Sequence, residues 1–592
     1  MYSDSSPYYS GSNGYDSRGN PDIAYWRYQI QCGIEFRRRA ASEVRWEMWR
    51  KMYRGDWAPG VLPSNLFFRM VRTVVPRIYF RNPSVSVTPR KPGMLNWAFA
   101  QMLERIDNKM LVKMRVKNET KRIVQNGWMF GTGIGKLGFG SQYAATPSPF
   151  GSTSPILTRK GQRLEYKSSI TENMPWFGSV HTGNFIVPAG CPSLSEARWV
   201  GEWHRRPLSD LQDDPRFENV PKLIPGMSPV GTPDYRSLGK SYKDSEPMID
   251  FVEIRDKKTK KVFIIPMNTG GEKPFLFEDD ELQIDGRLPY YDVVFNPDDE
   301  HFWGIPDSKI LEPQQLEINE IRTQQMKHRR LALVRIFAKR LGIKEDEAAK
   351  MVSEHVSPVV WTEGDPERSI KIFDGVDIPE GLLKMEAIIQ QDVREQMGFS
   401  RQEFGETSPG NARISAEETR VVKAATEIRI DERRDTMADM LVAFVEDMHQ
   451  VIFNNWTDEI ILDVTGPMGV PLWIKFRPDL LKGAEYTVGV DPDTSLPETK
   501  DIRQQKAIVS YQLLSSNPLI DPIRLTRYLL HELHGVQFDD MMRGMPPGLG
   551  GPEMPLDIEQ YIGLVQQVAS KVPQALTAGP SIAAPIEPTM FE

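Results

Sequence analysis

Apolar side chains recur at helical spacing through the first fifth of the chain. The spacing predicts a long, basic, amphipathic helix over 25–54, ended by Gly55, since glycine commonly follows the last turn of a helix. It predicts further helices over 64–80 and 96–126. Residues 1–24, rich in Ser, Gly, Tyr and Asn, are predicted to form a flexible arm. The apolar positions of the first helix are Ile30, Ile34, Val44, Met48 and Met52.

Residues 127–300 have a different pattern, with short runs of Val, Ile, Phe and Tyr separated by Gly, Pro and Asp. Such runs predict strands. The runs at 248–254 and 261–265 flank a Lys-rich turn and predict a β-hairpin. Residues 206–247, rich in Pro, Gly and Asp, predict an excursion at the surface. We expect an antiparallel, loop-rich α+β region here, in a chain that is predominantly helical.

Two long helices are predicted over 307–340 and 379–400. The middle of the first, 314–330, is polar almost all round. Such a helix is seldom buried in the core of one domain, and instead bridges domains or packs against copies of itself. Between the two helices, residues 341–378 contain short strand-like runs and predict a small β-containing module.

The rest of the chain begins with a polar loop at 401–414, which contains two glycines and a proline. A helix of about 40 residues is predicted over 415–454, opened by the capping-box pair Ser415 and Glu418. Further strands are predicted over 459–464, 473–476 and 486–490, and further helices over 498–516 and 519–535.

Composition narrows the function classes. No stretch of 18 apolar residues exists, so we expect no membrane-spanning helix. Cys32 and Cys191 are too few for a disulfide framework or a Cys-based metal cluster. The start of the chain lacks the basic and apolar regions of a signal peptide. A formal net charge of −7 argues, at first sight, against nucleic acid as the main partner.

The charge is divided unevenly along the chain. Residues 21–125 hold 21 Lys and Arg against 8 Asp and Glu, a net charge of +13, so that the residues after 125 carry −19. Segregation of this size favours two surfaces with different partners. A basic helix face that is merely solvated explains it equally well.

Three glycines, Gly133, Gly135 and Gly138, match the dinucleotide-binding pattern G-x-G-x-x-G. That interpretation needs a strand before the motif and a helix after it, so that phosphate meets the helix N-terminus. Here a helix precedes and strand-like residues follow, which favours a glycine-rich helix-to-strand junction. A nucleotide-binding enzyme is kept as an alternative.

Other candidate chemistry is weaker. His531 and His534 lie one residue short of the zinc-protease spacing. The acidic groups at 213–214, 278–281 and 298–300 lie in loops flanked by Pro or Gly, where carboxylates are more often solvated than catalytic or metal-binding. No Ser-His-Asp or Cys-His arrangement is recognisable. We therefore expect no enzyme activity, no catalytic residue, no metal and no cofactor.

Aromatic and basic residues interleave at 25–28 and 46–50. They are suited to stacking on nucleic-acid bases. Aromatic residues at helical spacing more often form the core, so the arginines are the better candidates for nucleic-acid contact.

The order of these elements resembles the portal protein of tailed bacteriophages, of the type found in short-tailed phages. Four places over about 25–540 carry the resemblance, and their order is more specific than any one motif. They are the basic helix over 25–60 with Asn65, Val-Val-Pro at 74–76 and Asn-Pro at 82–83; Gly-Trp-Met-Phe-Gly-Thr-Gly-Ile at 127–134; Trp-Gly-Ile-Pro-Asp-Ser at 303–308 with the polar helix that follows; and Val-Asp-Pro-Asp-Thr-Ser-Leu-Pro at 490–497.

The resemblance implies a division of the chain into parts. In that family twelve copies form a ring at one capsid vertex. The parts implied here are a wing (25–306 and 415–490), two stem helices (307–340 and 379–400), a clip (341–378), a tunnel loop (401–414), a crown (491–545) and a tail (546–592) that could extend the crown into a barrel.

The resemblance also implies a function without catalysis. The family passes double-stranded DNA through the channel during packaging and ejection, while a separate terminase hydrolyses ATP. The clip docks the terminase large subunit and later the tail adaptor. The implied partners also include the major capsid protein and a scaffolding protein, and the implied location is the virion, after synthesis in the cytoplasm of a bacterial host. Another self-assembling head–tail structural protein is kept as an alternative.

The site residues follow from this division. They are Arg401, Gln402, Glu403 and Arg413 in the tunnel loop; Trp361, Lys371 and Phe373 in the clip; and Gln314, Glu317, Asn319 and Arg322 in the stem. Solvated loop charges are an equally good interpretation of Arg401 and Arg413.

Overall fold

The computed structural model describes the helices, strands and connections on which the following account rests. The described residues are 14–15, 19–79, 84–91, 94–139, 175–213, 217–220, 248–267, 273–280, 282, 284–331, 335–338, 344–352, 361, 365, 370–373, 380–398, 416–455, 460–465, 471–476, 486–491, 500–515 and 529.

The fold is mixed α+β and rich in helix, as predicted. The helices are α1 (Ile23–Ala40), η1 (Glu43–Arg45), α2 (Trp46–Arg54), α3 (Leu66–Ile78), α4 (Met94–Lys113), α5 (Val116–Phe130), η2 (Thr182–Asn184), α6 (Leu208–Asp213), α7 (Asp307–Leu331), α8 (Glu345–Val352), α10 (Glu380–Met397), α11 (Ala416–Asn455) and α12 (Lys500–Leu514). The strands are β1 (Ser84–Pro89), β2 (Thr132–Phe139), β3 (Pro175–Val180), β4 (Phe185–Ile186), β5 (Trp199–Pro207), β6 (Met248–Asp256), β7 (Lys261–Pro266), β8 (Leu276–Asp279), β9 (Tyr290–Val294), β10 (Arg335–Ala338), β11 (Ile370–Phe373), β12 (Ile460–Thr465), β13 (Pro471–Phe476) and β14 (Tyr486–Asp491).

The main hydrophobic core surrounds a three-stranded antiparallel sheet in the order β3-β2-β9. Helices α2, α3, α5 and α11 contribute buried side chains to this core. The central strand β2 is buried along nearly its whole length. Its glycines permit this, because a Cβ on Gly133 would lie 2.2 Å from the backbone oxygen of Ile123 and one on Gly135 would lie 2.7 Å from the ring of Phe177.

A second, five-stranded antiparallel sheet has the order β4-β5-β6-β7-β8 and is covered by α1. Helix α1 begins after Asp22, whose carboxylate accepts hydrogen bonds from the N–H groups of Ala24 and Tyr25 at 3.0 and 3.3 Å. Its apolar face, which includes Trp26, packs on β5, β6 and β7. The predicted hairpin is confirmed as β6 and β7.

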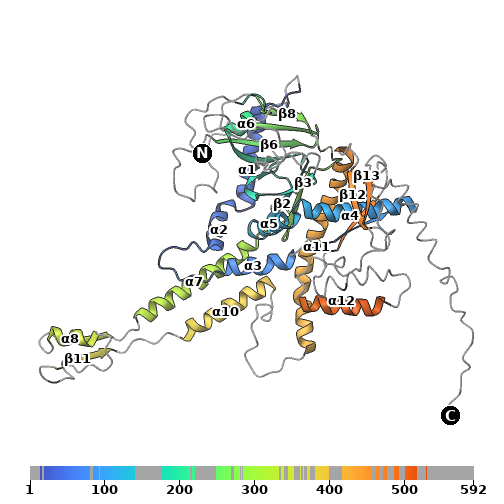
Figure 1. The fold of residues 1–592 in the computed structure, drawn as a ribbon. Helices are drawn as coiled ribbons and strands as arrows, with labels where there is room; N and C mark the ends of the chain where they lie inside the picture. Colours follow the sequence, from blue (N-terminus) through green and yellow to red (C-terminus); the bar gives the residue numbers. More distant parts are fainter. Residues whose placement is uncertain are drawn as a thin grey trace, which may run out of the picture.

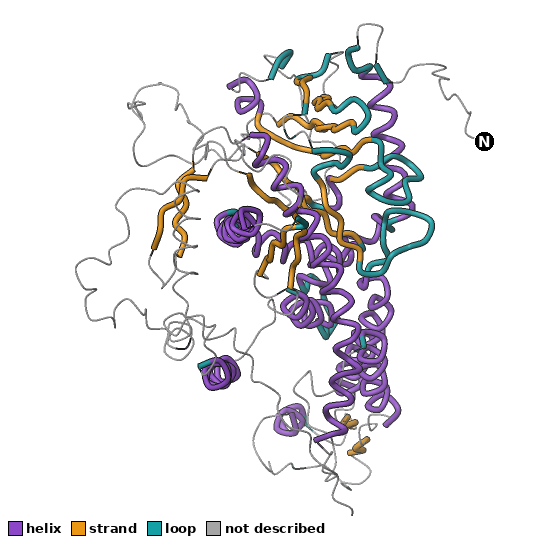
Figure 2. Tube along the Cα trace, turned by 90° about the vertical axis from the view of Figure 1, so that its right-hand side faces the viewer, coloured by secondary structure: helices purple, strands orange, loops and turns teal. Residues whose placement is uncertain are grey.

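Helices α7 and α10 run side by side out of the body and form an arm, with the short strands β10 and β11 and helix α8 near its far end (Figure 1). In the view turned by 90°, the sheets of the body lie in the upper half of the molecule and the arm runs downward (Figure 2). The long helix α11 passes beside the three-stranded sheet, where the Phe444 ring lies 4.5 Å from that of Phe177 on β3. Strand β14 pairs with the distant strand β1, which ties the C-terminal part to the N-terminal body.

Two segments were each predicted to form one continuous helix, and both predictions were wrong because each segment is broken into shorter helices. The helix predicted over 25–54 is interrupted at Ser42, and the one predicted over 96–126 is interrupted at Arg115. These two residues have φ angles of 53° and 56°, which end helical hydrogen bonding. The first break lets α1 pack on the five-stranded sheet while α2 enters the main core.

The helix predicted over 307–340 was wrong in its last part. Helix α7 ends at Leu331, and residues 335–338 form β10, in which Arg335 pairs with Phe373 and Ala338 with Ile370. Tertiary pairing outweighs the helical pattern here, since no glycine or proline marks the end of the helix. The helices predicted over 64–80, 379–400 and 415–454 are confirmed, with ends shifted by a few residues, as α3, α10 and α11.

Part of the N-terminal arm predicted over 1–24 is held by the body. The Tyr15 hydroxyl donates a hydrogen bond to Asp256 at 2.8 Å, and the Trp26 indole N–H donates to the Gly14 carbonyl at 2.8 Å. Several predicted segments lie outside the described residues, namely 221–247 of the surface excursion, the loop 401–414, almost all of 519–535 and the tail 546–592. Within the part of the chain that is described, no helix combines the length and apolar character needed to cross a membrane.

Candidate functional site

The residues predicted for the stem lie on α7, and two of them join this helix to other elements. Arg322 donates two hydrogen bonds to the Glu386 carboxylate on α10, at 2.7 and 3.0 Å. Asn319 is buried, and its side-chain oxygen accepts the N–H of Ser64 at 2.8 Å. Glu317 is exposed and Gln314 is half-buried. Arg322 and Asn319 therefore act within the chain.

Gln315, which the sequence did not single out, makes four side-chain hydrogen bonds from this helix. Its side-chain oxygen accepts the N–H groups of Leu66 and Phe67 at the start of α3, at 2.8 and 3.3 Å. Its amide donates to the Ser64 carbonyl at 2.6 Å and to Asn319 at 2.9 Å. Because the side chain of the N-cap residue of α3, Asn65, makes no capping hydrogen bond, Gln315 fills that role from α7.

Apolar side chains on the arm are left uncovered by the chain. Ile310 and Leu316 on α7 are 40% and 45% exposed, and Met385 and Ile388 on α10 are 38% and 49% exposed. Several large apolar residues exposed together on two adjacent helices are typical of a surface that meets another molecule.

The clip residues lie near the end of the arm. Trp361 is 72% exposed, and its backbone N–H donates to Glu347 at 3.1 Å. Lys371 and Phe373 belong to β11, opposite Phe337 and Arg335 of β10. The predicted tunnel-loop residues Arg401, Gln402, Glu403 and Arg413 lie outside the described residues.

The tryptophans of the N-terminal helices belong to the core, as the favoured interpretation predicted, whereas Tyr28 is 45% exposed. Trp26, Trp46 and Trp49 are 3% exposed or less. Arginines nearby also have partners within the chain. Arg37 pairs with Glu43 at 3.1 Å, and Arg45 pairs with the buried Glu312 of α7 at 2.6 Å.

The glycine motif at 133–138 lies in β2, directly after α5, so the predicted helix-to-strand junction is confirmed. A Cβ on Gly138 would meet the Trp176 ring at 2.1 Å. The glycines are therefore required for close packing. The whole motif lies within β2, so it does not form the turn from a strand into a helix that binds phosphate.

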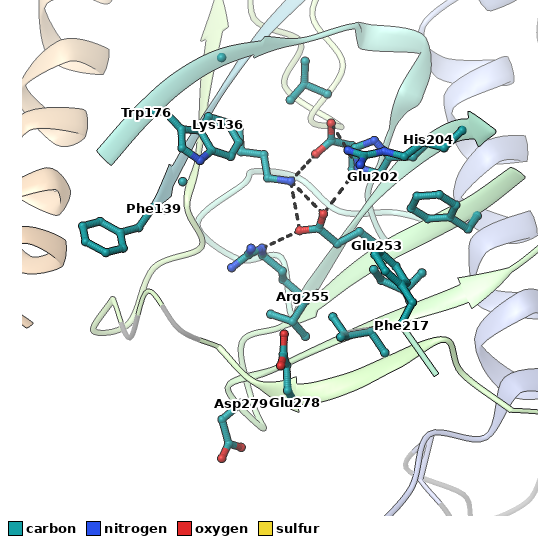
Figure 3. Close-up of a pocket in the computed structure, with 18 of the residues that line it drawn as sticks. Lys136, Phe139, Trp176, Glu202, His204, Phe217, Glu253, Arg255, Glu278 and Asp279 are labelled. Carbon is teal, nitrogen blue, oxygen red and sulfur yellow. Dashed lines mark hydrogen bonds and ion pairs between the residues drawn. The ribbon is translucent and has the colours of Figure 1, made fainter. Parts of the chain in front are cut away.

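A cluster of ionisable side chains lies beside a cavity of about 230 Å³ between β2 and the five-stranded sheet (Figure 3). Glu202 on β5 and Glu253 on β6 are direct cross-strand partners, so their like charges point to the same face of the sheet. Lys136 of β2 reaches across to both, with its Nζ 2.7 Å from Glu202 and 3.1 Å from Glu253.

Arg255 and Asp280 complete the ion pairs of this cluster. The Arg255 guanidinium lies 3.0 Å from Glu253 and 2.6 Å from Asp280. Burial alone would lower the pKa of Lys136, but the two glutamates outweigh it and raise this pKa above its ordinary value. Burial alone would raise the pKa of Glu253, but Lys136 and Arg255 hold it well below its usual range. Lys136 and Glu253 therefore remain charged inside the folded chain.

His204 and Tyr290 are further ionisable groups of the cluster, and the Tyr290 hydroxyl donates a hydrogen bond to Glu202 at 3.1 Å. His204 is the one that could bind a metal ion. It follows Glu202 by two residues on β5 and so lies on the same face of the sheet. One ligand atom each from Glu202, His204 and Glu253 can be chosen so that all three lie within 4.8 Å of one another. The spacing of Glu202 and His204 is the only local signal in the sequence, because Glu253 joins them solely through strand pairing.

No family model and no curated protein sequence matches the chain.

Proposed function

We propose that the chain is a portal subunit, one copy of a ring at a single capsid vertex through which double-stranded DNA is packaged and ejected. The observation that carries the proposal is the arm, in which α7 and α10 project from the body as an adjacent pair with a small β-containing module near its far end. The order wing, stem, clip, stem and wing expected from the resemblance matches this course of the chain.

The surface of the arm supports self-assembly. The exposed apolar residues of α7 and α10 need a partner, and the charged residues around them suit a wet interface. A head-to-tail contact between identical chains closes into a ring when its rotation permits. In this proposal, the arm of one subunit packs against the arms of its neighbours.

The charge distribution supports a conduit rather than a protein that grips DNA. Affinity for DNA comes mainly from cations that neutralise phosphates and release counterions. A chain with a net charge of −19 after residue 125 makes few such contacts along an acidic channel, so that DNA can slide. In the proposed assembly the motor and the ATPase activity belong to the terminase, and the clip provides its docking surface and that of the tail adaptor.

Purified full-length chain tests the proposal by negative-stain microscopy combined with light scattering. We expect a ring with a central channel wide enough for duplex DNA. Leu316→Glu together with Ile388→Glu on the arm should abolish the ring, because the charges would be buried between subunits. The control is Val112→Glu on α4, which changes an exposed apolar residue away from the arm. A wild-type chain that stays a 67.6 kDa monomer contradicts the proposal.

A further inference from the structure

The histidine of the charged cluster has an unusual environment. His204 Nε2 lies 3.6 Å from a Glu202 oxygen and 3.5 Å from a Glu253 oxygen. These separations are longer than the usual range for hydrogen bonds between nitrogen and oxygen. The Nε2 atom is nevertheless buried, and within the described parts of the chain it has no hydrogen-bond partner. A buried nitrogen of this kind is costly unless something else satisfies it.

The spacing suits ligands that share one metal ion. Zinc binds histidine nitrogen and carboxylate oxygen at about 2.0–2.2 Å in tetrahedral geometry, which places neighbouring ligand atoms about 3.4 Å apart. The two distances from His204 Nε2 are close to this value. Lys136 occupies the other oxygen of Glu202, Oε2, so that Oε1 faces the histidine. The Glu253 oxygen that faces the histidine, Oε2, also accepts a hydrogen bond from Lys136 at 3.1 Å, so a metal ion competes with the ammonium group there.

The charge of the cluster also favours a further cation. Lys136 and Arg255 carry two positive charges, against three negative charges on Glu202, Glu253 and Asp280. These ion-paired groups, counted without His204, have a net charge of −1 in a poorly hydrated place. The adjoining cavity has room for a water molecule as a fourth ligand.

We propose that Glu202, His204 and Glu253 form a binding site for a single divalent transition-metal ion of the zinc type. Two of the ligands come from β5 and one from β6, while Lys136 reaches the same carboxylates from β2. The ion would therefore link β5 and β6 within the five-stranded sheet, on the face that meets β2. The site is structural and does not depend on the portal proposal, because it lies in the body and not on the arm.

Zinc titration of the full-length chain tests the site, after chelator treatment and dialysis, by isothermal titration calorimetry. We expect one Zn²⁺ per chain, and His204→Ala should weaken binding by roughly tenfold or more through loss of the nitrogen ligand. His204→Gln serves as a second variant of similar size. The control is His301→Ala, which removes a half-buried histidine from a loop outside the cluster.

A second readout uses Co²⁺, whose visible absorption reports tetrahedral coordination. Wild-type chain should give this spectrum, and Zn²⁺ should displace it. Lys136→Met removes the competing ammonium group and should strengthen metal binding, with circular dichroism to verify folding. Absence of Zn²⁺ binding to the wild-type chain overturns the proposal, as does binding that the His204 variants leave unchanged.

Discussion

Asp447 of α11 shows how burial changes the ionisation of a single residue. Its carboxylate is fully buried, accepts a hydrogen bond from the Tyr291 hydroxyl at 2.9 Å and lies 3.7 Å from Arg287. Burial raises the pKa of Asp447 to about 6, while Tyr291 and Arg287 only partly oppose the effect. The folded chain therefore holds this proton more tightly than the unfolded chain does.

This shift predicts the sign of a pH effect. The stability contributed by protonated Asp447 is fully present below the unfolded pKa of about 3.9 and is lost as the pH rises through about 6. Asp447→Asn removes the titration and keeps an acceptor for Tyr291. The stability of the variant relative to wild type should therefore rise between pH 4 and pH 7, by up to about 3 kcal/mol.

Melting temperatures of both proteins across this pH range test the prediction. The control is Asp299→Asn, which neutralises an exposed carboxylate in a loop. Parallel pH profiles for wild type and Asp447→Asn would contradict the assignment of the shift to this residue.

At the scale of elements, Gln315 joins the arm to the body. Its side chain satisfies four polar partners, of which two are N–H groups in the first turn of α3. Gln315→Leu removes all four hydrogen bonds and leaves the buried N–H of Phe67 without this acceptor, which should lower the free energy of unfolding by about 2–4 kcal/mol. Chemical denaturation measures this change.

The neighbouring glutamine provides a matched control. The side-chain oxygen of Gln314 is buried without a hydrogen-bond partner in the described part of the chain. Gln314→Leu makes the same chemical change without breaking a bond to oxygen, so it should be close to neutral. If the two variants lower the free energy of unfolding equally, the hydrogen bonds of Gln315 make no specific contribution to stability.

The elements that were predicted correctly are marked by local signals in the sequence. Gly55 ends α2 with φ at 78°, and the two apolar runs that flank a Lys-rich turn form the hairpin of β6 and β7. The helix breaks at Ser42 and Arg115 could not be predicted, because residues of neither type require a positive φ. Tertiary packing imposes it there.

The charged cluster could be predicted only in fragments. Glu202 and His204 are separated by one residue in a predicted strand region, but Glu253 and Lys136 lie far from them along the chain. The register of β5 with β6 and the stacking of two sheets bring the four together. Local periodicity in the sequence determines neither the strand register nor the stacking of the sheets. The candidate site could therefore be recognised only in the folded structure.

At the scale of the whole molecule, the uneven charge has a partly internal explanation. Arg45, from the basic segment 21–125, pairs with Glu312 across 267 positions of the chain. Some of the +13 is thus matched by acidic residues that follow, through contacts that hold α2 to the root of the arm. The segregation of charge is therefore less complete on the folded molecule than along the chain.

The acidic remainder leads to a prediction that rests on the portal proposal. If the loop 401–414 lines the channel, Arg401 and Arg413 are cations that meet passing phosphates in an otherwise acidic chain. Arg401→Glu with Arg413→Glu should reduce the nuclease-protected DNA per particle, because repulsion replaces transient phosphate contact. Ring assembly should be unchanged, since the loop lies apart from the apolar residues of the arm along the chain.

The matched control for this pair is Lys258→Glu with Lys260→Glu, the same change of charge in the exposed turn between β6 and β7. Packaging assays report the DNA, and negative-stain microscopy reports the ring. Normal packaging by the arginine variant would show that the two side chains are solvated loop charges. Loss of the ring would show that the loop belongs to the subunit interface, because a channel-facing loop can change its charge without weakening contacts between neighbours.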